Sequence, residues 1–145
     1  VIFDPIKDEL FMTGKGNGAY LNNKRMRVSS RKNLKDSVIF FGGPKANQKD
    51  WTVGMQDYQK LSSAVISPIR KMGSAALDLA YVASGRGEGL CQRNLNYWDI
   101  AAGILMVKES GGIVSDFEGK QKYTENKTLL ASNSEINPEL LNVLK

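Results

Sequence analysis

The strongest candidate for a functional side chain is the carboxylate of Asp99, in the run Tyr97–Gly103. The residues that follow it, Ile100–Ser110, are mostly apolar and are predicted to form a helix that Asp99 can cap. An unpaired charge on a buried element costs free energy, so this carboxylate needs a partner. That partner is either the backbone amides at the helix start or a hard divalent cation, because Mg²⁺ prefers carboxylate oxygens.

A second candidate lies at Gly73–Ala76, where a glycine and a hydroxyl residue precede a predicted helix, Ser74–Ser84. Small side chains leave the first amides of such a helix accessible to a phosphate or a sugar hydroxyl, although an ordinary capped helix has the same pattern. The glycine-rich segment Gly14–Gly18 lacks the Gly-Lys-Ser/Thr ending of a phosphate-binding loop and lies between strands. It is therefore predicted to be a turn. Asp78, Asp116 and Glu118 are expected to be solvent-facing or turn carboxylates.

Histidine is absent from the 145 residues, which excludes mechanisms built on an imidazole base or a histidine-bound metal. The one cysteine, Cys91, cannot form an internal disulfide, so we expect a reducing compartment. The longest apolar run, Ile100–Val107, is far shorter than the roughly 20 residues that cross a bilayer. No signal segment opens the chain, and Val1 stands inside a predicted strand. We therefore expect a cytoplasmic chain that is a fragment of a longer protein.

The secondary structure predicted to position these residues consists of strands alone at the start of the chain and of strands and helices in the rest. The first part is predicted to be an antiparallel meander with a turn at Asn22-Asn23. Its strands are Val1–Phe3, Glu9–Thr13, Ala19–Leu21 and Arg25–Val28. Later strands are predicted at Ser37–Phe41, Ala64–Lys71, Gly89–Gln92, Ile113–Phe117 and Thr128–Ser132, and further helices at Trp51–Ser62 and Pro138–Lys145.

Strands separated by helices imply an α/β layer with mostly parallel neighbours. We therefore predict an α/β fold in two parts. Residues 1–36 form a β meander that belongs to an incomplete N-terminal sheet, and residues 37–145 form a C-terminal α/β layer of a mostly parallel sheet flanked by helices.

The net charge of +5 arises from 20 basic and 15 acidic residues, and the whole excess lies in residues 1–50. Six basic residues without an intervening acid form the basic stretch, which is Lys24, Arg25, Arg27, Arg31, Lys32 and Lys35. Such a stretch can contact nucleic acid or an acidic partner. A solvated hairpin edge has the same composition, because lysines there discourage strand aggregation.

Four segments together resemble the inositol monophosphatase family, close to its bacterial extragenic-suppressor branch. The segments are RKMGSAALDLAYVASG at Arg70–Gly85, WDIAAG at Trp98–Gly103, ESGGIVSD at Glu109–Asp116 and FDPIKDELF at Phe3–Phe11. The resemblance covers nearly the whole chain. It implies a layered α/β fold, a homodimer and Mg²⁺-dependent hydrolysis of phosphate monoesters by a metal-activated water, chemistry that needs no histidine.

By this resemblance Asp99 is a metal ligand, and Gly73, Ser74 and Ala75 form the segment whose backbone lines the substrate. Gln92 stands where the family commonly has a glutamate that contacts inositol hydroxyls, so specificity for inositol phosphate is an open question. The main metal motif, Asp-Pro-Ile/Leu-Asp-Gly-Thr, is not present. Asp4-Pro5-Ile6 imitates it, but Lys7 and Glu9 replace its second aspartate and its threonine, so the segment is interpreted as a turn.

The sequence therefore predicts the C-terminal portion of a phosphatase for a small phosphate monoester of the inositol-1-phosphate type. No catalytic residue is assigned with certainty within the chain, and the 145 residues alone are expected to be inactive. Two alternatives remain. One is a binding protein of the extragenic-suppressor type, which meets RNA polymerase or ribosomal RNA through the basic stretch. The other is a related phosphatase for nucleotide or sugar phosphates.

Overall fold

The computed structural model describes all of residues 1–145 and begins with a four-stranded antiparallel sheet. Its strands lie side by side in chain order: β1 (Ile2–Asp4), β2 (Glu9–Gly14), β3 (Gly18–Leu21) and β4 (Lys24–Arg25). Asn22 and Asn23 have φ values of 46° and 65° and form the predicted turn before β4. The last strand is shorter than expected because the Val28 amide donates to the carbonyl of Ser110 and leaves the sheet.

The second sheet is mixed, which corrects the expectation of mostly parallel pairing. Its order is β5 (Ile39–Gly42), β6 (Gly89–Arg93), β8 (Thr128–Ser132) and β7 (Ile113–Ser115), and only the pair β5–β6 is parallel. Helical connections do make β5, β6 and β7 run the same way. A loop without a helix joins β7 to β8, however, so β8 runs opposite to both neighbours and separates β6 from β7.

Four α-helices and one 3₁₀ turn complete the fold. They are α1 (Trp51–Ala64), α2 (Ala75–Ala83), α3 (Tyr97–Glu109), α4 (Asn137–Leu144) and the turn η1 (Leu34–Asp36). The prediction of a strand at 64–71 is wrong. The segment forms only a single β-bridge, in which Arg70 pairs with Phe40 of β5. Pro68 in this segment removes a donor that a full strand would need.

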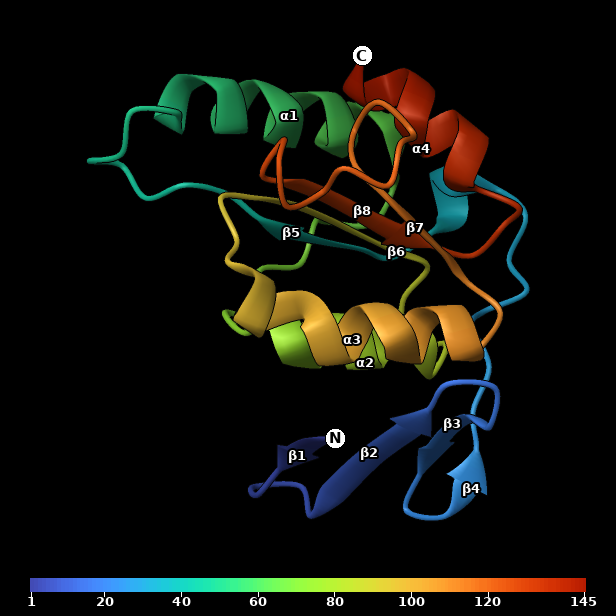
Figure 1. The fold of residues 1–145 in the computed structure, drawn as a ribbon. Helices are drawn as coiled ribbons and strands as arrows, with labels where there is room; N and C mark the ends of the chain where they lie inside the picture. The colour runs from blue at the N-terminus through green and yellow to red at the C-terminus, as the bar shows by residue number, and fades with distance from the viewer.

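The elements stack in four layers, which Figure 1 shows from top to bottom. Helices α1 and α4 cover one face of the second sheet, α2 and α3 cover its other face, and the first sheet lies beyond α2 and α3. Side chains alternate across the second sheet, so Phe40 and Leu90 face α2 and α3 whereas Phe41 and Leu130 join the core under α1 and α4. The layered α/β architecture that the sequence predicts is confirmed.

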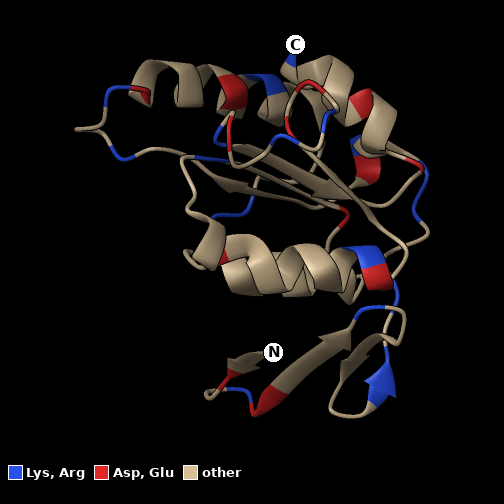
Figure 2. Ribbon diagram, in the orientation of Figure 1, with Lys and Arg blue, Asp and Glu red and all other residues tan.

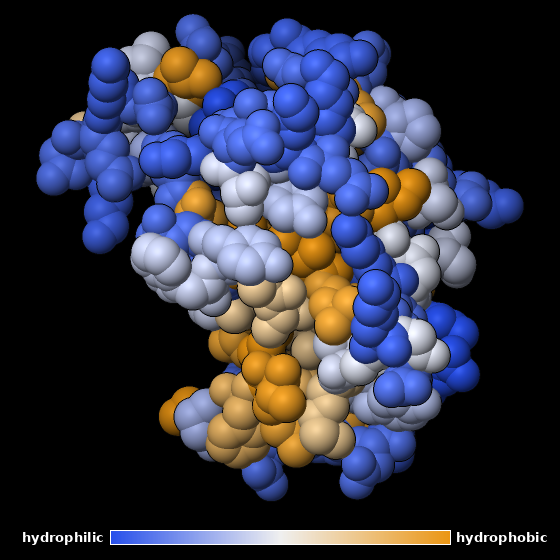
Figure 3. Space-filling view, viewed as in Figure 1, coloured by the Kyte–Doolittle hydropathy of each residue, from blue (hydrophilic) through white to orange (hydrophobic).

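The surface differs between the layers. Figure 3 shows hydrophilic side chains over α1 and α4 and a band of apolar side chains over α3 and the first sheet. Figure 2 shows basic residues on β4 and along the connection to β5, where all six residues of the basic stretch are exposed. None of the helices combines the length and the apolar character that a membrane crossing requires.

Candidate functional site

Asp99 lies in the first turn of α3, three residues after the N-cap residue Asn96. The helix starts at Tyr97, earlier than the sequence predicts, so Asp99 is not the residue that precedes the helix. Its Oδ2 atom accepts a hydrogen bond from the Asn96 amide at 3.2 Å, which is half of a capping box. Its Oδ1 atom accepts no hydrogen bond from the protein, and the side chain is half-buried. One carboxylate oxygen therefore serves the helix and the other is free to bind a ligand.

The start of α2 forms the opposite wall of the site. Ser74 is the N-cap residue, as predicted, and its Oγ accepts a hydrogen bond from the Leu77 amide at 3.3 Å. Gly73 has a φ of +92°, a conformation that favours glycine, and a Cβ there would meet no atom within 4 Å. Amides in the first turn of a helix have no partner within the helix, so this open segment exposes donors to the cavity.

Gln92 extends from β6 between the two helix starts. It pairs in the sheet with Gly42 of β5, where a Cβ would lie 2.1 Å from the Gln92 Cδ atom. Glycine at this position therefore makes room for the Gln92 carboxamide. The Gln92 Oε1 atom is buried and has no hydrogen-bond partner.

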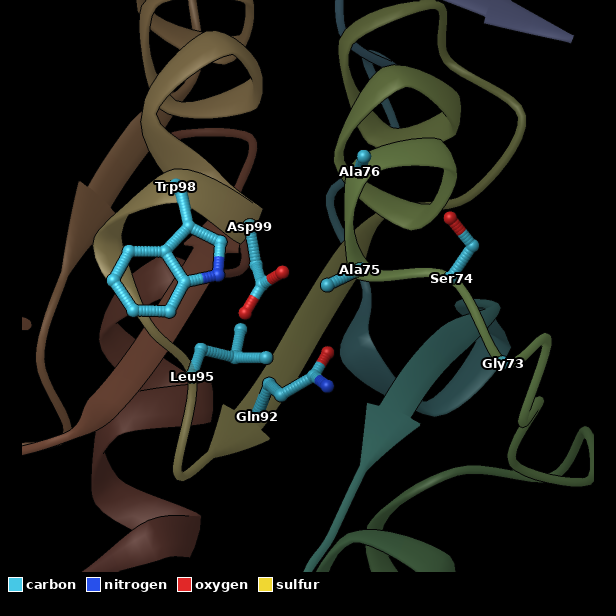
Figure 4. Close-up of a pocket in the computed structure, with 8 residues that line it drawn as sticks. All are labelled: Gly73, Ser74, Ala75, Ala76, Gln92, Leu95, Trp98 and Asp99. Carbon is cyan, nitrogen blue, oxygen red and sulfur yellow. The ribbon is translucent and has the colours of Figure 1, made fainter.

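These residues surround one cavity of about 450 Å³, the first cavity (Figure 4). Its lining is Gly73, Ser74, Ala75, Ala76, Gln92, Leu95, Trp98 and Asp99. Figure 4 shows the Asp99 carboxylate and the Gln92 carboxamide facing the same space, with Ala75 of α2 across from them. All five residues to which the resemblance assigns metal or substrate binding thus line a single cavity, although they come from separate elements.

The resemblance assigns no role to three of the lining residues, Ala76, Leu95 and Trp98. Ala76 and Trp98 lie inside the motifs that carry the resemblance, and their adjacency to Ala75 and Asp99 is a signal that could have identified them. Trp98 is 80% exposed, so its indole is available at the mouth of the cavity. Leu95 lies in the β6–α3 connection and has no sequence signal of its own.

The Asp4–Glu9 segment is a turn between β1 and β2, as predicted. The Asp4 Oδ1 atom accepts hydrogen bonds from the amides of Ile6 and Lys7. Glu9 forms a two-pronged ion pair with Arg86, which lowers the pKa of Glu9. None of these residues lines the first cavity.

The glycine-rich segment is also a turn, and a carboxylate of the protein occupies its amides. Gly16 and Gly18 donate to the two carboxylate oxygens of Glu109 at 2.8 and 2.9 Å. These hydrogen bonds hold the pKa of Glu109 below its usual value.

The expectation that Asp78 faces solvent or a turn is wrong. Asp78 is only 2% exposed, and its Oδ1 atom has no hydrogen-bond partner. The cause is its position on α2, which turns it inward against the second sheet. Asp116 is a turn carboxylate, accepting from the amides of Glu118 and Lys120, although it is fully buried. Cys91 is also buried, and burial raises the pKa of its thiol, so it is not a nucleophile.

No group of three or more acidic, cysteine or histidine side chains gathers anywhere in the structure as a metal site. Asp99 is the one carboxylate in the first cavity. A carboxylate oxygen suits a hard cation such as Mg²⁺, which requires about six oxygen ligands in octahedral geometry. Asp99 therefore fits the role of one ligand in a larger set.

Comparison with known proteins identifies the family. A profile described as the inositol monophosphatase family matches residues 1–145. This chain belongs to that family. The family resemblance inferred from the motifs is thus confirmed over the whole length of the chain.

Relatives within the inositol monophosphatase family carry two kinds of name. An inositol-1-monophosphatase of Mesorhizobium japonicum is 42% identical over all of this chain and 54% of its own length. A protein named Nus factor SuhB from Pseudomonas aeruginosa is 38% identical, again over all of this chain and 54% of its own length. The chain therefore spans about half the length of the curated relatives it matches.

Solved structures of the family share the fold. The extragenic suppressor protein suhB from Bartonella henselae superposes with a TM-score of 0.93 at 44% identity, covering 99% of this chain and 54% of that one. The inositol monophosphatase from Anabaena superposes with a TM-score of 0.90 at 32% identity, covering 98% of this chain and 56% of that one.

Proposed function

We propose that this chain is the C-terminal portion of a Mg²⁺-dependent phosphatase that hydrolyses a small phosphate monoester of the inositol-1-phosphate type. The observation that carries the proposal is the convergence of Asp99, Gly73–Ala75 and Gln92 on the first cavity. Family membership supports phosphatase chemistry, and the relatives named inositol-1-monophosphatase support the substrate class.

In this proposal Asp99, the Gly73–Ala75 segment and Gln92 have separate tasks. Asp99 directs Oδ1 toward the cation while the hydrogen bond from the Asn96 amide to Oδ2 fixes the side-chain rotamer. The open backbone at Gly73–Ala75 donates hydrogen bonds to the substrate. Gln92 contacts substrate hydroxyls through a neutral carboxamide, which both donates and accepts.

The remaining oxygen ligands of the cation would come from the part of the full-length protein that lies outside these 145 residues. When bound, Mg²⁺ would neutralise charge on the phosphate and lower the pKa of the attacking water. Homodimerisation and a cytoplasmic location stay predictions.

Replacing Asp99 by Asn in the full-length protein tests the assignment. Because Asn keeps an oxygen that can accept from the Asn96 amide, α3 should retain its start and the thermal unfolding midpoint should change little. Loss of a metal ligand should reduce phosphate release from inositol 1-phosphate by at least about 100-fold, since even residues that only orient metal ligands cost 10–100-fold. Activity is measured as phosphate release with millimolar Mg²⁺.

Asp36→Asn is the matched control, because Asp36 is exposed and lies outside the first cavity. Wild-type rates in the Asp99→Asn protein would leave Asp99 with the capping role alone. Residues 1–145 by themselves should release no phosphate, and turnover by this chain would contradict a site completed from elsewhere.

A second candidate function is binding to RNA polymerase or ribosomal RNA. The relatives named Nus factor SuhB favour it, and so does the exposed basic stretch. A separate surface cavity of about 480 Å³ is lined by Lys24, Arg25 and Arg27 of this stretch and by Arg86. A nucleotide or sugar phosphate as substrate remains a variant of the first proposal.

A further inference from the structure

The first cavity has an apolar side that the function proposed above does not use. Leu95 and Trp98 form this side, next to Asp99. Figure 4 shows their side chains on the same side of the cavity as the Asp99 carboxylate, whereas Ala75 lies across from them. Leu95 is half-buried and packs against the larger hydrophobic core, so its place in the wall is fixed.

Trp98 exposes a large apolar surface at the mouth of this cavity. Its side chain is 80% exposed, although an indole gains much free energy when it is removed from water. It takes part in none of the aromatic pairs and in none of the contacts between a cation and a ring within the chain. These 145 residues therefore leave a flat apolar surface uncovered beside the candidate metal ligand.

The position of Trp98 relates this surface to the substrate. Trp98 directly precedes Asp99 and borders the same cavity as the open backbone of Gly73–Ala75. The cavity has a volume of only about 450 Å³. An alcohol that is esterified to a phosphate in this cavity therefore shares the space that the indole borders.

A rigid ring is the shape that best suits the flat indole. Apolar contact stabilises a complex in proportion to the area removed from water, and a ring presents one broad face. A flexible chain must lose rotational freedom before it makes the same contact. Nucleic-acid bases stack on aromatic side chains in this way, largely irrespective of which base is bound.

We propose that Trp98 stacks against a ring of the leaving group and is a specificity-determining residue, which favours phosphate esters of cyclic alcohols over those of acyclic alcohols. This inference rests on the proposed phosphatase function, which supplies the phosphate ester. The contact uses the hydrocarbon face of the ring and none of its hydroxyl groups, so it is independent of any contact with Gln92.

The test compares two esters that differ in the ring and carry no free hydroxyl group. Cyclohexyl phosphate and isopropyl phosphate are both esters of secondary alcohols, so their intrinsic reactivity is similar. In the full-length protein with Mg²⁺, Trp98→Ala should lose about fivefold or more in kcat/KM for cyclohexyl phosphate and change less than about twofold for isopropyl phosphate. Trp98→Phe, which keeps a flat ring, should recover most of the loss.

Tyr97→Ala is the matched control, because Tyr97 is the neighbouring exposed aromatic residue and does not line the first cavity. This variant should match wild type on both esters. An equal loss on both esters in Trp98→Ala would show that Trp98 acts through the adjacent Asp99, and unchanged rates would show that no ring stacks there. Either outcome overturns the proposal, as do equal values of kcat/KM for the two esters in the wild-type protein.

Acrylamide quenching of tryptophan fluorescence separates this inference from the phosphatase function itself. Subtracting the signal of Trp98→Phe from that of wild type isolates Trp98, and saturating cyclohexyl phosphate should reduce its quenching whereas isopropyl phosphate should not. Protection without phosphate release would support the stacking and contradict the phosphatase function, and phosphate release without protection would do the reverse. An indole that acrylamide does not reach before the ester is added is covered by the rest of the full-length protein, and this result also overturns the proposal.

Discussion

The two carboxylate oxygens of Asp99 have different environments in the structure. The Oδ2 atom accepts from the Asn96 amide, and Oδ1 has no partner in the protein. The hydrogen bond at the helix start restricts the rotation of the Asp99 side chain and so fixes the direction of Oδ1. The choice between cap and metal ligand that the sequence presents is therefore not an exclusive one.

At the same scale, Gly42→Ala should disturb the site through Gln92. The new Cβ would lie 2.1 Å from the Gln92 Cδ atom, so the carboxamide or the strand must move. We expect a loss of about 1–3 kcal/mol in the free energy of unfolding, measured by urea titration. Combining Gly42→Ala with Gln92→Ala should recover at least about 1 kcal/mol of that loss.

Gln92→Ala alone completes the double-mutant cycle and serves as the control. Strictly additive effects of the two substitutions would mean that Gly42 and Gln92 do not compete for the same space.

At the scale of elements, the site exists because α2 and α3 begin at the same edge of the second sheet. Ser74 and Asn96 start the two helices, and β6 ends between them with Gln92 and Arg93. Two helix N-termini that face one cavity favour an anionic ligand, because both present free amides and the positive ends of their dipoles. This arrangement agrees with a phosphate ester as substrate.

Close packing between the two helices depends on Gly103. A Cβ at this position would lie 2.5 Å from the Leu79 Cβ atom of α2. Alanine is the better helix former by about 1 kcal/mol, but overpacking costs about 1–3 kcal/mol. Gly103→Ala should therefore lower the thermal unfolding midpoint, measured by circular dichroism, despite the gain in helix propensity.

The control for Gly103→Ala is the reverse substitution on the same helix. Ala101 is only half-buried, so Ala101→Gly should destabilise by about 1 kcal/mol through propensity alone. A higher unfolding midpoint for Gly103→Ala would show that α2 and α3 do not need the close approach.

At the scale of the whole molecule, charge and chemistry lie in different places. The candidate site is at the starts of α2 and α3, whereas the basic stretch runs from β4 to η1 and does not line the first cavity (Figure 2). Substitutions in the basic stretch can therefore test the proposed RNA binding without changing a residue of the first cavity.

The double variant Arg25→Glu/Arg27→Glu in the full-length protein should leave phosphate release unchanged. If the stretch contacts RNA, affinity for a ribosomal RNA fragment should fall, and the slope of log K against log salt should decrease by about 0.7 for each lost contact with single-stranded RNA. Filter binding at several salt concentrations measures both quantities.

Lys49→Glu/Lys145→Glu is the matched control, because it makes the same change in net charge at exposed positions outside the stretch. Equal RNA affinity in both double variants would leave Arg25 and Arg27 as solvated surface.

Much of the local structure follows from sequence alone. The start of α2 at Ser74, the turn at Asn22-Asn23 and the meander were predicted correctly, since caps, turns and alternation depend on neighbours within a few residues. The site residues were named from motifs, and the structure brings them to one cavity.

Only the tertiary structure decided what depends on contacts between distant segments. The insertion of β8 between β6 and β7 made the second sheet mixed, because the direction of a strand depends on its partners and not on its own residues. The inward position of Asp78 was likewise missed, since a helix periodicity does not say which face the sheet will cover.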